Sequence, residues 1–334
     1  MIATTGIRQP KRQCLLFLLS LVACCLLAVP ASAAKVSIRS HEDRLEVYSG
    51  EELRAAYIFR GHSRPLIYPV VGPYGLKMTR AFPIIPDVPG EPRDHVHQKS
   101  MFFAHGKVNG VNFFKDGSDA GTTVHKQPPS YKCYADRAVI EGVVDWRGPD
   151  GKIVCTDKRR LTFRMVPDGQ IIDWQVTLCA SHGELNFGDD KHGLMAIRMH
   201  PSLQLHKHPT QKKSTANGQV INSEGVKGEG VFGKRARWID YWGKIDGKEV
   251  GIAVFDHPAN PRHPVWWMAR GYGYLGADPF GAHCIGGEPP GTGDMRIPDG
   301  KSITFRYRYV FHAGDPKEAG IERLYQSYVK ESEE

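Results

Sequence analysis

Three histidines and an aspartate lie close together in residues 92–106, whose sequence is PRDHVHQKSMFFAHG. Residues two apart on a strand point to the same face, so we expect His95 and His97 to present their rings side by side to one cavity. Two such imidazoles suit a metal ion or an acid/base pair acting on a sugar. The alternative is that both are hydrogen-bonded loop residues. His105 lies roughly 26 Å beyond His97 on a straight strand, so the chain must turn for all three to meet.

A second polar cluster occupies residues 256–267, whose sequence is DHPANPRHPVWW. Its three prolines fix the loop backbone, so the polar groups are held at little entropic cost. Arg262 offers a planar fork that suits a carboxylate or vicinal hydroxyls, and Asn260 and His263 lie beside it. Trp267 offers a flat apolar face of the type on which sugar rings stack. The alternative is that the two tryptophans alternate, one in the core and one exposed, and that Arg262 makes an ordinary ion pair.

Two further residues complete the predicted site. Glu224 is the carboxylate expected to act as general base, because a carboxylate near a protonated histidine can remove a proton from a sugar. The alternative is a turn glutamate in solvent. His192, Arg198 and His200 share one parity, so an unbroken strand would aim all three at one face, and a core-edge role is the alternative. The predicted catalytic residues are His95, His97, His105 and Glu224, and the predicted substrate-binding residues are Arg198, Asn260, Arg262, His263 and Trp267.

The chain begins with the features of an export signal. A basic start precedes an apolar run over residues 14–29, and the Ala-Ser-Ala that follows matches a cleavage site. The run is shorter than the roughly 20 apolar residues of a spanning helix. We therefore expect residues 1–33 to be a signal peptide and the mature protein to be periplasmic or secreted. An alternative is a lipoprotein signal in which Cys24 is lipidated.

Charge and cysteine usage exclude several classes of protein. The chain has 44 Lys and Arg against 36 Asp and Glu, without a long basic block interleaved with aromatics, so we expect no nucleic-acid partner. None of the cysteines beyond the signal forms a C-x-x-C pair, which argues against a zinc ribbon. They permit one or two disulfides, with Cys133 and Cys155 as one candidate pair, or buried free thiols. These cysteines are Cys133, Cys155, Cys179 and Cys284.

Strand signals recur along the chain, and helix signals are almost absent. Alternating apolar and polar runs, separated by turns such as Pro-Asp-Gly, predict a large antiparallel β-sandwich, an all-β fold, as a single domain over residues 34–334. One helix is expected at about 315–331, because Asp315 can cap it and Glu318 follows three residues later. The expected strands cover residues 35–40, 44–49, 53–59, 138–146, 153–166, 171–178, 194–199, 236–241, 250–255 and 303–312.

Several segments resemble the DUF6807 family, which automatic naming often calls methane oxygenase PmoA. They are residues 64–75, 94–100, 103–113, 233–241, 256–264 and 278–281, and the resemblance covers nearly all of the mature chain. The family usually has a further histidine and a basic residue after the first histidine pair, where this chain has Gln98 and Lys99. The resemblance implies a galactose mutarotase-like supersandwich, which in relatives binds sugars in a groove on one sheet. It supplies no catalytic residues.

The leading hypothesis is an exported carbohydrate-active enzyme that uses acid/base chemistry at a sugar ring, as a hydrolase, lyase or epimerase without a cofactor. A non-catalytic glycan-binding module is one alternative. A metal-dependent oxygenase, with a divalent metal on His95 and His97, is another. The chain has no apolar run after Val29 long enough to span a membrane, so we do not expect a membrane-embedded methane monooxygenase subunit.

Overall fold

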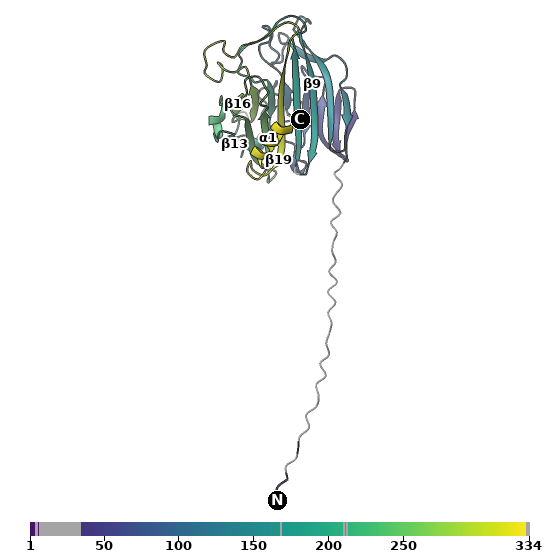
Figure 1. Ribbon diagram of the computed structural model, residues 1–334, viewed down its shortest axis with the longest axis vertical. Helices are drawn as coiled ribbons and strands as arrows, with labels where there is room; N and C mark the ends of the chain where they lie inside the picture. Colours follow the sequence, from purple (N-terminus) through teal and green to yellow (C-terminus); the bar gives the residue numbers. More distant parts are fainter. Residues whose placement is uncertain (4–5, 7–34, 168, 210, 212, 332–334) are drawn as a thin grey trace. The chain divides into compact units, whose positions relative to one another are not determined.

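The computed structural model describes residues 1–3, 6, 35–167, 169–209, 211 and 213–331 (Figure 1). The apolar run expected as an export signal, its cleavage site and Cys24 lie outside these residues. The chain divides into a unit Met1–Ala33 and a unit Ala34–Glu334, and the features below belong to the second unit. Within the described ranges, no helix is both long enough and apolar enough to cross a membrane.

Two large antiparallel sheets build the second unit. In spatial order, the 8-stranded sheet contains β1 (Val36–Ser40), β2 (Arg44–Ser49), β3 (Glu52–Ile58), β4 (Leu66–Val70), β5 (Met101–Phe103), β12 (Met195–Arg198), β17 (Tyr274–Asp278) and β16 (Trp266–Arg270). The 9-stranded sheet contains β13 (Gln219–Asn222), β14 (Trp238–Ile245), β15 (Lys248–Asp256), β19 (Ser302–Ala313), β10 (Gly169–Cys179), β9 (Ile153–Val166), β8 (Arg137–Arg147) and β6 (Thr122–His125), with β7 (Ser130–Cys133) also paired to β8. A small separate pair is formed by β11 (Leu185–Phe187) and β18 (Met295–Ile297).

The main core lies between the two large sheets. Met195 and Ile197 of β12 belong to the same buried cluster as Trp174 and Val176 of β10. The residues between them on each strand point the other way, because successive strand side chains alternate between faces. The all-β antiparallel sandwich predicted from the alternating sequence is therefore confirmed.

The short loops between long strands follow the turn sequences. Asp246 and Gly247, between β14 and β15, have φ values of 48° and 77°. Both central residues of a two-residue type I′ turn need positive φ, which Asp-Gly tolerates. Another Asp-Gly pair connects β8 to β9, and there the glycine, Gly151, has a φ of 81°. These turns set the registers of the long hairpins.

The C-terminal helix α1 (Ile321–Glu331) packs on the outer face of the 9-stranded sheet, beside β19 (Figure 1). The expected cap forms, since Asp315 Oδ1 accepts hydrogen bonds of 2.8 Å from the backbone N–H groups of Lys317 and Glu318. Gly320 then adopts a φ of 66°, which interrupts the capped turn. The helix therefore begins at Ile321 and not directly after the cap. The described residues also form three single-turn 3-10 helices, η1 (Pro73–Gly75), η2 (Pro201–Leu203) and η3 (Gly228–Val231).

Loops cover the outer face of the 8-stranded sheet. Ala196 of β12, Tyr274 of β17 and Phe102 of β5 point away from the main core and pack with Phe114 from a loop. This second apolar layer supports the polar residues described below. The four cysteines beyond the expected signal are free thiols, and β7, which carries Cys133, pairs with β8 and not with the strand of Cys155.

Candidate functional site

The histidine segment is a loop on the outer face of the 8-stranded sheet. Residues 91–99 contain no strand, so the expectation that His95 and His97 share a strand face is wrong. His95 has a φ of 43°, a left-handed conformation that turns the backbone at this point. The two rings nevertheless lie close, with centroids 5.7 Å apart and planes at 81°. The turn at His95, and not a shared strand face, brings the rings of His95 and His97 together.

Two buried arginines hold this loop. The Arg80 guanidinium donates hydrogen bonds of 2.9–3.1 Å to the Asp94 side chain and to the carbonyl groups of residues 92, 94, 95 and 98. Arg198, at the end of β12, donates to Asp94 Oδ1 at 3.0 Å and to Gln98 Oε1 at 2.5 Å. Both arginine side chains are 0% exposed. The guanidinium groups of Arg80 and Arg198, each of which donates several hydrogen bonds, therefore fix the loop against the sheet.

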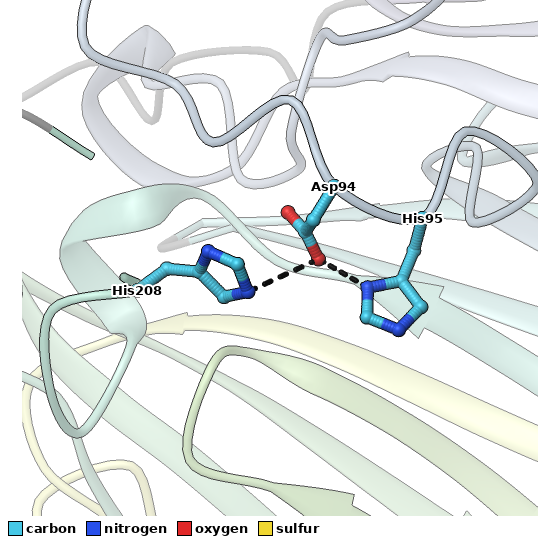
Figure 2. Close-up of side chains that lie close together, drawn as sticks. All are labelled: Asp94, His95 and His208. Atoms are coloured by element: carbon cyan, nitrogen blue, oxygen red, sulfur yellow. Dashed lines mark hydrogen bonds and ion pairs between the residues drawn. The ribbon is translucent and has the colours of Figure 1, made fainter. Parts of the chain in front are cut away.

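Asp94 joins two histidines at the surface of this arrangement (Figure 2). Its Oδ2 atom accepts a hydrogen bond from Nδ1 of His95 and lies 3.5 Å from Nε2 of His208. The Asp94 side chain is 8% exposed and the His95 side chain 40%. Figure 2 shows Nε2 of His95 pointing away from Asp94. The cluster thus has a buried carboxylate and a partly exposed imidazole.

The electrostatics keep Asp94 ionised. Burial alone would raise the pKa of Asp94, but the hydrogen bond from His95 and the charges of Arg198, Arg80 and His208 lower it well below its usual range. An ionised carboxylate can only accept, so His95 carries a proton on Nδ1, and a neutral ring in this position would have its lone pair on Nε2. That tautomer is the one a general base requires.

Aromatic rings surround the cluster. His95 stacks on Tyr272 with centroids 5.3 Å apart and planes at 10°, and the Arg198 guanidinium lies 4.6 Å from the same ring. His97 meets the edge of Phe114, and Phe114 stacks on His192 at 4.4 Å. Burial, followed by the charges of His95 and Arg64, lowers the pKa of His97 to about 4. His97 is therefore neutral at ordinary pH.

A cavity of about 240 Å³ shares Tyr272 with the cluster. Its polar lining includes Glu229, whose Oε1 lies 3.3 Å from Nδ1 of His206. Gly271 also lines it, and a Cβ there would lie only 2.2 Å from the His206 ring. Pockets for drug-sized ligands span about 300–1,000 Å³, so this one suits a ligand with a single ring.

His105 lies apart from this cluster. It is 0% exposed, packs against Phe187 and Phe280, and donates from Nε2 to the carbonyl of Gly188 at 2.8 Å. Burial lowers the pKa of His105 to about 4. A ring in this position has no surface for a substrate. The turn required for it to join His95 and His97 does not occur.

The loop of residues 256–267 lies at the other end of the β16–β17 hairpin. The Arg262 guanidinium donates to the carbonyl groups of Pro279, Gly293 and Asp294 at 2.6–3.0 Å, just beyond the end of β17. Tyr272, next to His95, lies before the start of β17, a strand about 13 Å long. The structure therefore does not bring Arg262 to the histidine cluster.

Hydrogen bonds within the loop account for its other polar residues. Asn260 Nδ2 donates to Asp256 Oδ1 at 2.8 Å and to the carbonyl of Arg306 at 2.7 Å, which attaches the loop to β19. His263 Nδ1 lies 2.7 Å from Asp256 Oδ2. These bonds hold Asn260 and His263 in the loop and away from Asp94.

Two further predicted residues lie in unremarkable surroundings. The Trp267 ring is 0% exposed in the main core, and its Nε1 donates to the carbonyl of Ala236 at 2.9 Å. No face of this ring is available for stacking on a sugar. Glu224 lies exposed in a turn, where Ser223 Oγ donates to its Oε1 at 2.8 Å. Of the predicted residues, His95, His97 and Arg198 belong to the cluster around Asp94, and Asn260 and His263 meet separately at Asp256.

Sequence patterns missed several residues of this cluster. His208 comes from a long loop without regular spacing to residues 94–97, and Arg80 precedes the loop that it holds. Tyr272 and Glu229 come from the β16–β17 turn and from η3. Among these residues, the sequence pattern indicated only the position of Arg198. Arg198 and Ala196 are two positions apart on β12, so both point to the outer face of the 8-stranded sheet.

These features describe an antiparallel sandwich with a polar, histidine-rich site on one outer face. The chain belongs to the DUF6807 family, described as a family of unknown function, whose model matches residues 44–326. No curated protein matches the chain.

Several solved structures are similar to the chain at low sequence identity. One is a galactose mutarotase related enzyme from Lactobacillus acidophilus, with 9% identity over 83% of this chain and 97% of that one and a TM-score of 0.34. Another is a putative aldose 1-epimerase from Escherichia coli K12, with 11% identity over 84% and 99% and a TM-score of 0.34. A polysaccharide lyase shows 9% identity over 85% of this chain and 33% of that chain, with a TM-score of 0.29. These TM-scores are low, so the β-sandwich assignment rests on the sheet topology.

Proposed function

We propose that the protein is an exported carbohydrate-active enzyme whose general base is His95. The observation that carries the proposal is the ionised Asp94 carboxylate, which accepts a hydrogen bond from Nδ1 of His95, while Nε2 of this 40% exposed side chain points away from it. The family resemblance seen in the sequence implies a sugar groove on one sheet, and the outer face of the 8-stranded sheet is where this cluster lies.

Each neighbour has a role in this proposal. Asp94 fixes the His95 tautomer and stabilises the imidazolium that forms when Nε2 takes a proton. Arg80 and Arg198 hold Asp94 in place and keep it charged. Tyr272 supports the His95 ring from one face and forms a wall of the neighbouring cavity, which accepts the sugar ring.

The reaction class that fits is proton transfer at a sugar carbon or hydroxyl, as in epimerisation, elimination or hydrolysis. Glu229 supplies a carboxylate in the wall of the cavity that also contains Tyr272, the ring on which His95 stacks. A histidine and a carboxylate can serve as base and acid on one substrate. No cofactor is needed for such a transfer.

The test is a panel of oligosaccharides, including oxidised sugars, assayed with the wild type, with His95→Ala and with His182→Ala. His182 is exposed in the turn between β10 and β11, so it is a matched control. We expect turnover by the wild type and the control, and a loss of about 100- to 10,000-fold in His95→Ala. Binding without any turnover would support a glycan-binding module and would contradict the enzyme, as would unchanged activity in His95→Ala.

A second candidate is a divalent-metal centre on Asp94, His95 and His208. Their potential ligand atoms all lie within 4.8 Å of one another. Two imidazoles and one carboxylate match the donor set of non-haem iron oxygenases, and they also suit zinc or copper. When bound, such a metal would supply Lewis-acid or redox chemistry at the outer face of the 8-stranded sheet.

The metal candidate predicts about one equivalent of iron, copper or zinc in freshly purified protein. His208→Ala should lose this metal while His182→Ala retains it. Protein that carries no stoichiometric metal, and that takes none up from solution, would exclude this candidate and leave the acid/base proposal in place.

A further inference from the structure

The opposite outer face, that of the 9-stranded sheet, carries polar side chains in register across neighbouring strands. Arg160 of β9 pairs with Gln175 of β10, and Gln175 pairs with Arg306 of β19. Side chains directly opposite each other on antiparallel strands lie about 5 Å apart on one face, so these three form a line across the sheet. The next line on the same face is formed by Lys158, Thr177 and Thr304.

Two adjoining cavities, of about 360 and 500 Å³, lie over these lines and share Arg160 and Gln175. We call the pair the cationic groove. It is bounded at one end by Tyr328 of α1 and at the other by residues 127–130. The groove therefore crosses the strands from α1 to the loop before β7.

The positive charge of the groove exceeds its negative charge. Arg308 is held by Asp173 at 2.6 Å and by Glu331 at 2.8 Å, and Arg160 is held by Glu141 at 2.5 Å. Arg159, which also lines the groove, is buried and held by Asp157 at 2.8 Å. The remaining cations that line the groove are Lys158, Arg164 and Arg306.

Lys158 and Arg306 are the cations that are available to a ligand. Neither has an ion pair within the described ranges, whereas Arg164 lies 3.5 Å from Asp173 and from Glu331. The positive charge of the groove also affects the pKa of His257, which lies at the α1 end. Burial first, and then the charge of Arg306, lower its pKa to about 4.

Apart from Tyr328 at the α1 end, which is buried, the remaining exposed lining is polar. Gln175 and Thr177 offer an amide and a hydroxyl between the cations. Trp174 and Tyr307 line one cavity, but both are 1% exposed and belong to the main core. Proteins that bind single-stranded nucleic acid add exposed rings on which bases stack, and this lining lacks them.

We propose that the cationic groove binds an acidic polysaccharide. Acidic groups of the polysaccharide pair with Arg306 and Lys158, and its ring hydroxyls bond to Gln175 and Thr177. Strands lie about 4.8 Å apart, which is similar to the length of one sugar ring, so successive sugars along the groove meet side chains of successive strands. The groove lies on the other side of the sandwich from Asp94 and is therefore a binding surface separate from the proposed active site.

The test measures binding of a uronic-acid oligosaccharide by titration calorimetry at low and moderate salt. The wild type should bind it, bind a neutral oligosaccharide of equal length far more weakly, and lose affinity as salt rises. The double variant Lys158→Glu/Arg306→Glu should bind about tenfold more weakly or worse, because each change replaces an attraction with a repulsion.

The matched control is Lys152→Glu/Arg296→Glu, two exposed positions that give the same change in net charge. It should keep wild-type affinity. Thermal unfolding of both double variants establishes that each is folded. The proposal is overturned by absent binding at low salt, by equal losses in the control, or by tighter binding of single-stranded DNA of equal charge. None of these results bears on the acid/base site.

Discussion

Arg198 and Asp94 are 104 positions apart in the chain, and their side chains meet at 3.0 Å beneath the histidine cluster. The pair joins β12 to the loop that carries His95 and His97. Both side chains are buried, so the ion pair exchanges little with water and its geometry is fixed by the sheet.

Asp94→Asn should both destabilise the protein and remove its activity. The change leaves Arg80 and Arg198 buried without a counter-charge, which costs about 3–5 kcal/mol of unfolding free energy. It also removes the group that fixes the His95 tautomer, so kcat should fall about 100-fold or more. Urea unfolding and turnover assays measure the two effects. The control is Asp87→Asn, an exposed partner of Arg93, which should change stability by about 1 kcal/mol or less.

Glu224→Gln should leave kcat/KM unchanged, because Glu224 is exposed in a turn and its partner is Ser223. Its stability should change by about 0.5 kcal/mol or less. Glu229→Gln, in the wall of the cavity next to Tyr272, should lower kcat/KM by about 100-fold if the carboxylate transfers a proton. Steady-state kinetics measure both variants. A loss of kcat/KM in Glu224→Gln with none in Glu229→Gln would instead support Glu224 as the general base.

Trp267→Ala should act on stability and not on ligand binding. The ring is fully buried between the sheets, so its removal should cost about 3–5 kcal/mol. Trp266→Ala is the paired comparison, since that ring is half-buried with the Arg235 guanidinium 4.4 Å away, and it should cost about 1 kcal/mol. Chemical denaturation separates them. A fully stable Trp267→Ala protein that no longer binds sugar would contradict the core placement.

His105 should make the protein less stable in acid. Burial lowers its pKa to about 4, and the neighbouring Asp190 opposes that shift while His192 adds to it. The folded state therefore favours the neutral ring, and the unfolded chain, with an ordinary value near 6.5, binds the proton more readily. The stabilisation is present above about pH 6.5 and is lost as pH falls towards about 4, on the order of 3 kcal/mol in all.

The measurement is the unfolding free energy of the wild type and His105→Gln between pH 7.5 and pH 4. The variant should lose less stability over this interval than the wild type, whatever its stability at neutral pH. His182→Gln, exposed in a turn, should follow the wild-type slope. Equal slopes in all three proteins would show that His105 is not the group responsible.

The sequence by itself determined the strands and the class of fold. Strand alternation and Asp-Gly turns are local properties, so β9, β10 and β19 could be predicted from their own residues. The cap at Asp315 is also a local feature and could be predicted, but the positive φ of Gly320 delays the start of α1 to Ile321. The proximity of His95 to His97 needed only two residues of separation.

The tertiary structure decided which of the candidate residues form a site. His208, Arg198 and Tyr272 reach Asp94 from distant segments, and no spacing in the sequence encodes such contacts. Tertiary packing also excluded His105 and Trp267 from the candidate site. Both rings are buried, because segments distant in the sequence pack on them. Side-chain types thus indicated a candidate histidine site, and the packing of the two sheets and their loops decided which residues lie together in it.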